Sequence, residues 1–223
     1  MGVIMRKYDK IETIYARDVE GTKKLCPGVF RDPTVRYLAD LRWDWTEKID
    51  GTNIRVCWDG HKITFGGRTD NANIPAELVT RLNEIFINDA AEELFEQTFG
   101  EHEVIIFGEG YGRKIQKAGS YYIPTGVDFI VFDVLVGDNY QERYWVGKTA
   151  AMFGLKTVPI VGSGTLYDAV KYISTHPMSN IAAKPIEMEG VVCRPQPELR
   201  DRCGNRVIVK IKWNDIKEIV DII

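Results

Sequence analysis

Lys48 stands in a segment whose residue types suit covalent chemistry. It lies in the stretch Glu-Lys-Ile-Asp-Gly-Thr-Asn (47–53), where a strand is expected to run into a glycine-containing turn. A lysine amine attacks an electrophile at neutral pH only where desolvation or neighbouring cations favour its uncharged form. On this segment alone, a surface lysine before an Asp-Gly turn is the simpler interpretation.

Later segments supply the partners that a nucleophilic lysine would need. Two carboxylates stand beside glycines, an arginine follows a hairpin, and two lysines alternate in a strand: Glu109 (FGEGYG), Glu189 (EMEGVVCR), Arg68 (GGRTD), Lys210 and Lys212 (VIVKIK). Side chains alternate along a strand, so the two lysines point to the same face. Carboxylates for a metal and a sugar, with cations for phosphates, suit attack on the α-phosphate of a nucleoside triphosphate. The P-loop pattern is absent from the sequence.

Composition narrows the class of protein further. The net charge of −3 does not suit a dedicated non-specific nucleic-acid binder, although basic residues cluster at 113–117 and 194–212. On charge alone, these clusters also fit solvated faces. Cys26, Cys57, Cys193 and Cys203 form no CxxC pair, which favours reduced cysteines in a cytoplasmic protein. The chain lacks a long apolar run and a signal-peptide pattern, so we expect no membrane association.

The elements that must position these residues follow from hydrophobic periodicity. Leu78, Leu82, Ile85, Phe86, Ala90 and Leu94 recur at helical spacing and predict one helix over 76–99. An Asp59-Gly60 step predicts a hairpin turn. Strands are predicted over 42–48, 52–58, 62–66, 103–110, 128–136, 191–194 and 206–212, and further helices over 146–154, 165–175 and 213–223. The pattern indicates an α+β fold with antiparallel β-sheets flanked by helices, in a single domain over 1–223.

Six motifs in order resemble the covalent nucleotidyltransferase superfamily of DNA ligases, RNA ligases and mRNA capping enzymes: EKIDGTN, GGRTD, FGEGYG, DFIVFDV, MEGVVCRP and VIVKIK. The resemblance spans residues 4–212 and implies an ATP-grasp-like nucleotidyltransferase (adenylation) domain. Asn53, GRKIQK (112–117), GNRVIVKIK (204–212) and the opening KYDKIETIY resemble the phage-type RNA ligases that seal nicks in duplex RNA. That branch often has His where this chain has Asp50.

The resemblance implies a role for each matching residue. Lys48 would carry AMP, with Asp50, Glu189, Lys210 and Lys212 completing the catalytic set, although Asp50 also fits a turn. Glu47, through the backbone beside it, and Ile49 would place the adenine, with Phe132 stacked on it and Glu109 at the ribose. Asn53 would act near the phosphates or the nicked end, Arg68 at the AMP phosphate or ribose, and Lys210 and Lys212 at phosphate oxygens. Glu189 would hold the metal. Phe132 also fits a core position, and Arg194 stands where the branch often has lysine.

The implied activity is ATP-dependent RNA ligation through lysyl-AMP, with Mg²⁺ or Mn²⁺, joining a 5′-phosphate to a 3′-hydroxyl during RNA repair. We expect a cytoplasmic monomer. A DNA ligase, a GTP-dependent capping enzyme and a non-catalytic nucleotide- or RNA-binding module stay open as alternatives. Residues 213–223 are too few for a separate C-terminal domain, so the chain is either a minimal ligase or the catalytic part of a longer protein. In a minimal ligase Arg113, Lys117 and Arg194 would contact RNA themselves.

Overall fold

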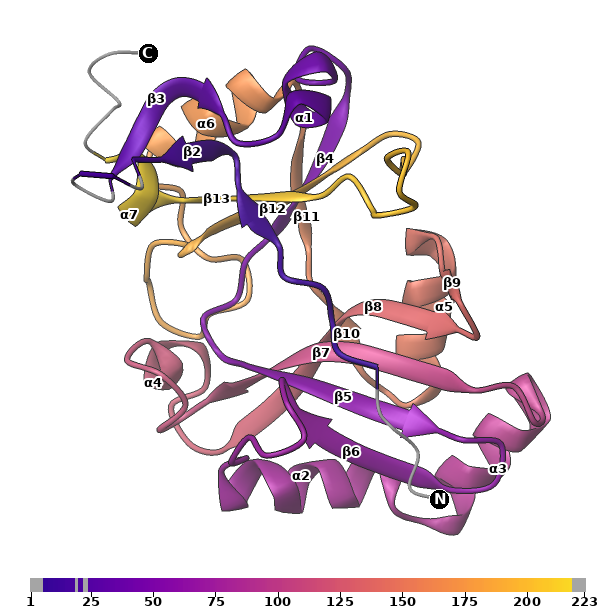
Figure 1. Ribbon diagram of the computed structural model, residues 1–223. Helices are drawn as coiled ribbons and strands as arrows, with labels where there is room; N and C mark the ends of the chain where they lie inside the picture. The colour runs from indigo at the N-terminus through magenta and orange to yellow at the C-terminus, as the bar shows by residue number, and fades with distance from the viewer. Residues whose placement is uncertain (1–5, 19, 22–23, 218–223) are drawn as a thin grey trace. The chain divides into compact units, whose positions relative to one another are not determined.

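The computed structural model describes residues 6–18, 20–21 and 24–217 (Figure 1). The chain divides into two compact units. Unit 1 comprises Met1–Asp9, Asp50–Val158 and Ala182–Lys184, and unit 2 comprises Lys10–Ile49, Pro159–Ile181 and Pro185–Ile223. The single nucleotidyltransferase domain over residues 1–223 stays a prediction.

Unit 1 is built on a mixed sheet with the strand order β10-β8-β7-β5-β6, and β9 pairs with β8. All of its strand pairs are antiparallel except β10 with β8. The strands are β5 (Thr52–Trp58), β6 (Ile63–Gly67), β7 (Val104–Gly112), β8 (Val127–Val136), β9 (Asn139–Tyr140) and β10 (Lys156–Thr157).

The turn between β5 and β6 confirms the predicted hairpin. The Asp59 carboxylate accepts hydrogen bonds from the backbone N–H groups of His61 and Lys62, at 3.0 and 2.9 Å. Gly60 has φ of +94°, a conformation that residues with a side chain rarely adopt. The sequence therefore fixes where β5 ends and β6 returns.

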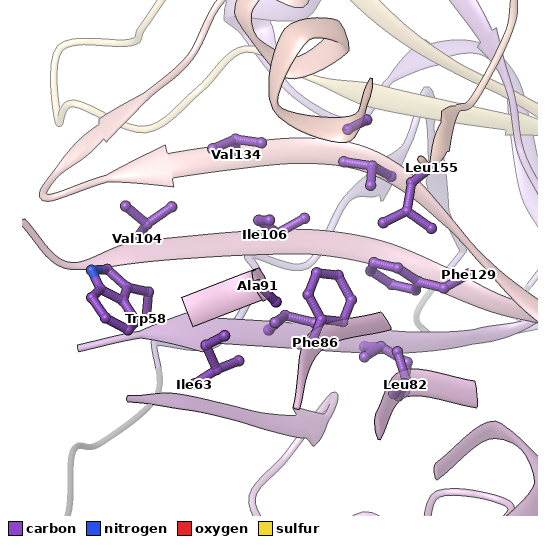
Figure 2. Close-up of a cluster of buried hydrophobic side chains, with 14 of the residues drawn as sticks. Trp58, Ile63, Leu82, Phe86, Ala91, Val104, Ile106, Phe129, Val134 and Leu155 are labelled. Atoms are coloured by element: carbon purple, nitrogen blue, oxygen red, sulfur yellow. The ribbon is translucent and has the colours of Figure 1, made fainter. Parts of the chain in front are cut away.

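Helices of unit 1 share one hydrophobic core with one face of this sheet. They are α2 (Ala76–Phe86), α3 (Asp89–Phe99) and α5 (Arg143–Met152). The short α4 (Gly119–Tyr122) follows β7 and contributes no residue to this core. Figure 2 shows Leu82 and Phe86 of α2 and Ala91 of α3 in one cluster with Ile106 and Phe129 of the strands. Burial on this face leaves the opposite face of the sheet for polar and aromatic side chains.

The prediction of a single helix over 76–99 was wrong, because the helix is interrupted at Ile87 and Asn88. The Asn88 side chain accepts a hydrogen bond from the Ala91 N–H at 3.0 Å and begins a new helix. The new helix has a different phase, so Ala91 and Phe95 are buried, whereas Ala90 is exposed. A capping residue inside an apparently continuous apolar pattern was the overlooked signal.

Unit 2 is built on a second sheet with the strand order β1-β13-β12-β4-β11 and a separate β2-β3 pair. Only β1 and β13 pair in parallel among these strands of the described residues. The strands are β1 (Glu12–Thr13), β2 (Tyr15–Arg17), β3 (Leu25–Phe30), β4 (Trp43–Glu47), β11 (Ile160–Gly164), β12 (Gly190–Pro195) and β13 (Val209–Lys212), and the helices are α1 (Pro33–Tyr37), α6 (Leu166–Ser174) and α7 (Trp213–Ile216).

The two faces of the unit 2 sheet differ as the alternation in β13 predicts. Val209 and Ile211 are buried in a core that includes Val170 of α6. Lys210 and Lys212 lie on the other face, half-buried. The sheet therefore carries an apolar face against helices and a polar face that displays amines.

The structure confirms an α+β fold with antiparallel sheets flanked by helices. Elements between residues 12 and 37 had no counterpart among the predictions. The helix predicted over 213–223 is described as α7 up to Ile216, and residues 218–223 lie outside the described part of the chain. None of the helices described is both long and apolar enough to cross a bilayer.

Candidate active site

Lys48 follows β4 directly and is held beside Glu189 in unit 2. Its backbone N–H donates to the carbonyl of Gly190 at 2.9 Å. Its ammonium group donates to Oε2 of Glu189 at 2.5 Å, and the Lys212 ammonium contacts the other oxygen of that carboxylate. The side chains of Lys48 and Glu189 are 25% and 18% exposed, so a small ligand can reach the pair from solvent.

Lys210 adds a third amine to this group. Burial, and then the charges of Lys212 and Lys48, lower the pKa of the Lys210 amine below its ordinary value. The nearby carboxylates of Asp215 and Glu12 oppose this shift without cancelling it. The polar face of the sheet is therefore cation-rich, which is the setting that binding of an anion relieves.

The backbone around Lys48 is fixed by buried neighbours. The Glu47 side chain accepts hydrogen bonds from the Ser179 hydroxyl at 2.5 Å and from the Asn180 N–H at 2.9 Å. Burial raises the pKa of the Glu47 carboxyl above its ordinary value, against the opposing effect of these two bonds. On the other side of Lys48, Ile49 is 3% exposed. Glu47 thus acts through its side chain as an anchor for the segment around 179–180.

Gly190 is required where β12 begins. A side chain there would place its Cβ 2.8 Å from Cα of Lys212 and against the Ile211 carbonyl. The absent side chain lets β12 and β13 approach closely, so that Glu189 can reach both Lys48 and Lys212. This gives a physical reason for the glycine after Glu189 in the sequence.

Unit 1 presents a second set of predicted residues on the sheet face opposite its helices. Asn53 of β5 and Glu109 of β7 are direct cross-strand partners. Within the described residues, the buried side-chain oxygen of Asn53 has no hydrogen-bond partner. A side chain on Gly51 would come within 2.8 Å of the Glu109 side chain and meet the backbone of Gly110. The glycine after Asp50 therefore permits close approach of this segment to β7.

Phe132 reaches the same face through a β-bulge in β8. Phe107 pairs with Asp133 and the next residue, Gly108, pairs with Val131, which leaves Phe132 as the extra residue. The Asp133 carboxylate accepts a hydrogen bond from the Tyr8 hydroxyl at 2.7 Å, and the Tyr8 and Phe132 rings meet edge-on at 4.9 Å. Bulges re-aim side chains near functional sites. Here the bulge brings Phe132 beside Tyr8.

Arg55 is a residue of this face that the sequence predictions missed. Its side chain is fully buried, donating to the Gly67 carbonyl at 2.7 Å and to Asp70 at 2.9 Å. These bonds fix the segment that presents Arg68, which is exposed. An arginine in the middle of an apolar strand, with an aspartate two residues beyond Arg68, was the available signal.

Asp50 and the loop after β7 lie near the Gly51 turn within unit 1. The Asp50 N–H donates to the Tyr122 hydroxyl at 3.4 Å, and Gln116 donates to the Gly51 carbonyl at 3.1 Å. Gln116 has a positive φ of 57° and Lys114 one of 64°, so the loop is strained. It presents two of the predicted RNA-binding residues, Arg113 and Lys117, both exposed.

Arg194, the third predicted RNA-binding residue, lies in a different setting. Its side chain is 6% exposed and lies 3.9 Å from the Glu198 carboxylate, which also pairs with Arg206 at 2.9 Å. The RNA contact of Arg194 stays a prediction, and a nearly buried guanidinium would have to make it.

A divalent metal would bind the unit 2 site through one carboxylate and a bound nucleotide, rather than through a cluster of protein ligands. Among the described residues, no group of three or more His, Cys, Asp or Glu side chains is arranged to hold a metal ion. Mg²⁺ typically keeps several waters and binds one or two carboxylates together with substrate phosphates. Glu189 supplies one carboxylate, so the residues present fit a metal that arrives with a nucleotide.

The family described as RNA ligase matches residues 42–212, which is more than half of the chain. The chain therefore belongs to the RNA ligase family. No curated protein sequence matches it.

Solved structures of a Naegleria gruberi RNA ligase share the fold. A lysine-to-alanine variant with ATP and manganese has 19% identity and a TM-score of 0.65, covering 98% of this chain and 58% of its own. The ligase with pyrophosphate has 19% identity and a TM-score of 0.63, covering 99% and 60%. A lysine-to-methionine variant with AMP and manganese has 17% identity and a TM-score of 0.64, covering 98% and 59%. The chain thus spans less than two thirds of the length of each of these three structures.

Proposed function

We propose that this chain is the adenylation module of an ATP-dependent RNA ligase and that it carries AMP on Lys48. The observation that carries the proposal is the arrangement around Glu189. Two amines, those of Lys48 and Lys212, share one carboxylate, and Lys210 adds charge beside them. Two amines on one carboxylate, with a third amine whose pKa their charges lower, suit the binding of a polyanion, and Lys48 is the amine that directly follows β4.

The proposed reaction has three steps, and each bond that breaks releases a group of ATP, Lys48 or RNA. The Lys48 amine, after losing a proton, attacks the α-phosphorus of ATP, and the bond to the leaving pyrophosphate breaks. An oxygen of the RNA 5′-phosphate then attacks the same phosphorus and frees the lysine. The 3′-hydroxyl of the neighbouring end finally attacks the 5′-phosphorus and expels AMP. Alignment of the two ends would supply much of the rate.

The residues of unit 1 would recognise the nucleotide. Glu109 would accept hydrogen bonds from the ribose, Phe132 would stack on adenine, and Asn53 and Arg68 would approach phosphate. Support comes from the buried Asn53 oxygen, which has no partner in the described part of the chain and is costly to leave unbonded. This oxygen accepts, so a ligand hydroxyl such as one on the ribose would complete its bonding, while the Asn53 amide N–H would donate to phosphate. Asp50 would assist Lys48 from the turn that joins the two sets along the chain.

Glu189 would hold the metal, Mg²⁺ or Mn²⁺, which when bound would offset the negative charge of the triphosphate. Release of the carboxylate from Lys48 would then free the amine to lose its proton. In this proposal Lys210 and Lys212 keep their charge and hold phosphate oxygens. Glu47 and Ile49 would place the adenine through the backbone that they fix.

RNA with 5′-phosphate and 3′-hydroxyl ends is the proposed substrate, at nicks in a duplex as in the phage-type branch. Arg113 and Lys117 would contact its phosphates, and Arg194 would make a further contact. We propose that the protein acts as a monomer in the cytoplasm, in RNA repair.

Incubation with α-labelled ATP or GTP and Mg²⁺ tests the proposal. We expect an acid-labile label from ATP on the wild type and none on Lys48→Arg, which keeps the positive charge but has no comparable nucleophile. Label from GTP alone would indicate a capping enzyme, and label from neither would indicate a binding module. Sealing of a nicked DNA duplex in preference to a nicked RNA duplex would indicate a DNA ligase.

A further inference from the structure

Helix α5 in unit 1 exposes two adjacent aromatic side chains that the proposed reaction does not use. Tyr144 is 63% exposed and Trp145 is 55% exposed. The opposite side of the helix is fixed in the core by Val146 and Ala150. The helix therefore cannot rotate to bury the aromatic pair within unit 1.

Exposure of this kind is unusual for tryptophan in this chain. Trp43, Trp45 and Trp58 are all at most 6% exposed, and Trp213 is only partly exposed. Large aromatic side chains are enriched where a protein binds another molecule. An exposed pair on a well-anchored helix therefore indicates a contact surface.

The aromatic pair is ordered by contacts of its own. The Tyr144 and Trp145 rings meet edge-on with centroids 5.0 Å apart, and the Lys148 ammonium lies 5.5 Å from the Tyr144 centroid. A cation over a ring face favours this orientation. The surface is thus arranged before any ligand arrives.

Charge around the pair indicates what kind of ligand it fits. Lys148 and Lys156, the latter on β10, which packs against α5, are exposed. Arg143 adds a third cation while donating to backbone carbonyls at 2.9 and 3.0 Å. The helix itself contains no acidic residue, and Glu142 is its N-cap residue. The surface combines exposed rings with excess positive charge.

We propose that Tyr144 and Trp145 stack on an unpaired base of a single-stranded RNA segment, while Lys148 and Lys156 contact the flanking phosphates. That the strand is RNA rests on the proposed function. Base–aromatic stacking with basic side chains alongside is the chemistry by which proteins hold single strands. A duplex hides its base faces, so the segment would be an unpaired end or overhang. This surface uses none of the residues assigned to Lys48 chemistry or to the loop at 113–117.

Fluorescence anisotropy with a labelled single-stranded RNA tests the surface without ATP. We expect Trp145→Ala to weaken binding about tenfold. Trp145→Phe, which keeps a ring, should bind within a few-fold of the wild type. Tyr37→Ala removes an aromatic side chain that is 87% exposed in unit 2 and should bind like the wild type. Lys48 labelling from ATP should be the same in all four proteins.

The same titration with an RNA that contains abasic sites separates stacking from charge. We expect the wild type to bind this RNA as weakly as Trp145→Ala does, and the substitution to have no further effect. Equal affinity of the wild type and Trp145→Ala for intact RNA would overturn the inference. So would an equal loss on both RNAs, or Trp145→Phe binding as weakly as Trp145→Ala.

A protein partner is the competing occupant. A change in sedimentation of Trp145→Ala without a change in RNA affinity would assign the surface to a second copy of the chain and overturn the inference. Absence of label on wild-type Lys48 would instead contradict the proposed function. Since the RNA titration contains no nucleotide, the two failures are distinguishable.

Discussion

The polar faces of the two large sheets differ in how their charged groups are compensated. In unit 1, the Arg55 guanidinium is fully buried and bonded to Gly67 and Asp70, and Asp133 accepts a bond from Tyr8. In unit 2, the Lys48 and Lys212 amines share the Glu189 carboxylate, and their charges contribute to the lowered pKa of the nearby Lys210 amine. The buried charged groups of the first face are bonded within unit 1, whereas the second face places three amines close together.

This difference assigns separate tasks to the two faces in the proposed function. A face whose charges are already bonded is rigid, and it recognises a ligand through shape, as Phe132 and Asn53 would. A face with excess charge gains most when an anion binds, because the anion relieves the repulsion between its cations. Substitutions in unit 2 should therefore mainly affect chemistry, whereas those in unit 1 should affect stability or recognition.

The largest effect is expected for Glu189→Gln. The amide keeps the shape but loses the charge that pairs with Lys48 and Lys212 and that would hold the metal. We expect formation of lysyl-AMP to slow by about 10²-fold or more, measured in single-turnover labelling at several Mn²⁺ concentrations. Glu187→Gln is the matched control, since Glu187 is 55% exposed and pairs with His176. Equal rates in the two variants would contradict a role for Glu189 in chemistry.

Arg55→Met tests the internal compensation of unit 1. The Gly67 carbonyl loses a buried donor, so we expect the free energy of unfolding to fall by about 2 kcal/mol in urea denaturation. The lost pair with Asp70 adds little, since Asp70 is 54% exposed. Arg68→Met should unfold like the wild type but bind ATP more weakly. Wild-type stability of Arg55→Met would show that this bonding is dispensable.

Substitutions of Phe132 test whether this side chain recognises adenine or only packs within unit 1. Phe132→Ala should weaken ATP binding about tenfold, from the usual value of base–aromatic stacking. Phe132→Leu is the decisive variant because it keeps apolar volume without an aromatic face, and it should bind as weakly as the alanine variant. Titration with a fluorescent ATP analogue measures both. If the leucine variant binds like the wild type, Phe132 is a packing residue.

Local patterns were sufficient to predict much of this molecule. The strands β5 and β6, the turn at Asp59 and the shared face of Lys210 and Lys212 all follow from periodicity and turn chemistry within a few residues. These features depend on neighbours along the chain, so the sequence displays them directly. The order of the motifs then predicted the family.

Other features depend on partners distant in sequence and were not predictable. The Glu47 carboxylate is held by Ser179, and Tyr8 is bonded to Asp133. The bulge at Phe132 arises from the register between two strands, which no single strand reveals. Tertiary pairing, rather than propensity, therefore sets the orientation of several candidate site residues.

The Lys210→Met variant, for which we expect the smallest effect, tests whether excess positive charge in unit 2 lowers the free energy of unfolding. The Lys210 pKa lies below its ordinary value of 10.5. Between the folded-state pKa and 10.5 the unfolded chain binds more protons, so stability from this group rises with pH across that window. At neutral pH the amine is charged in both states, and the folded state bears the whole electrostatic cost.

Lys210→Met should therefore melt slightly above the wild type at neutral pH, and the gain should shrink in alkaline buffer. The variant should also form lysyl-AMP more slowly, since it loses a phosphate-binding charge. Lys212→Met is the matched control: it loses the contact with Glu189 and should melt below the wild type. A melting temperature of Lys210→Met below that of the wild type at neutral pH would mean that the amines of unit 2 are fully compensated, and the contrast between the two faces would not hold.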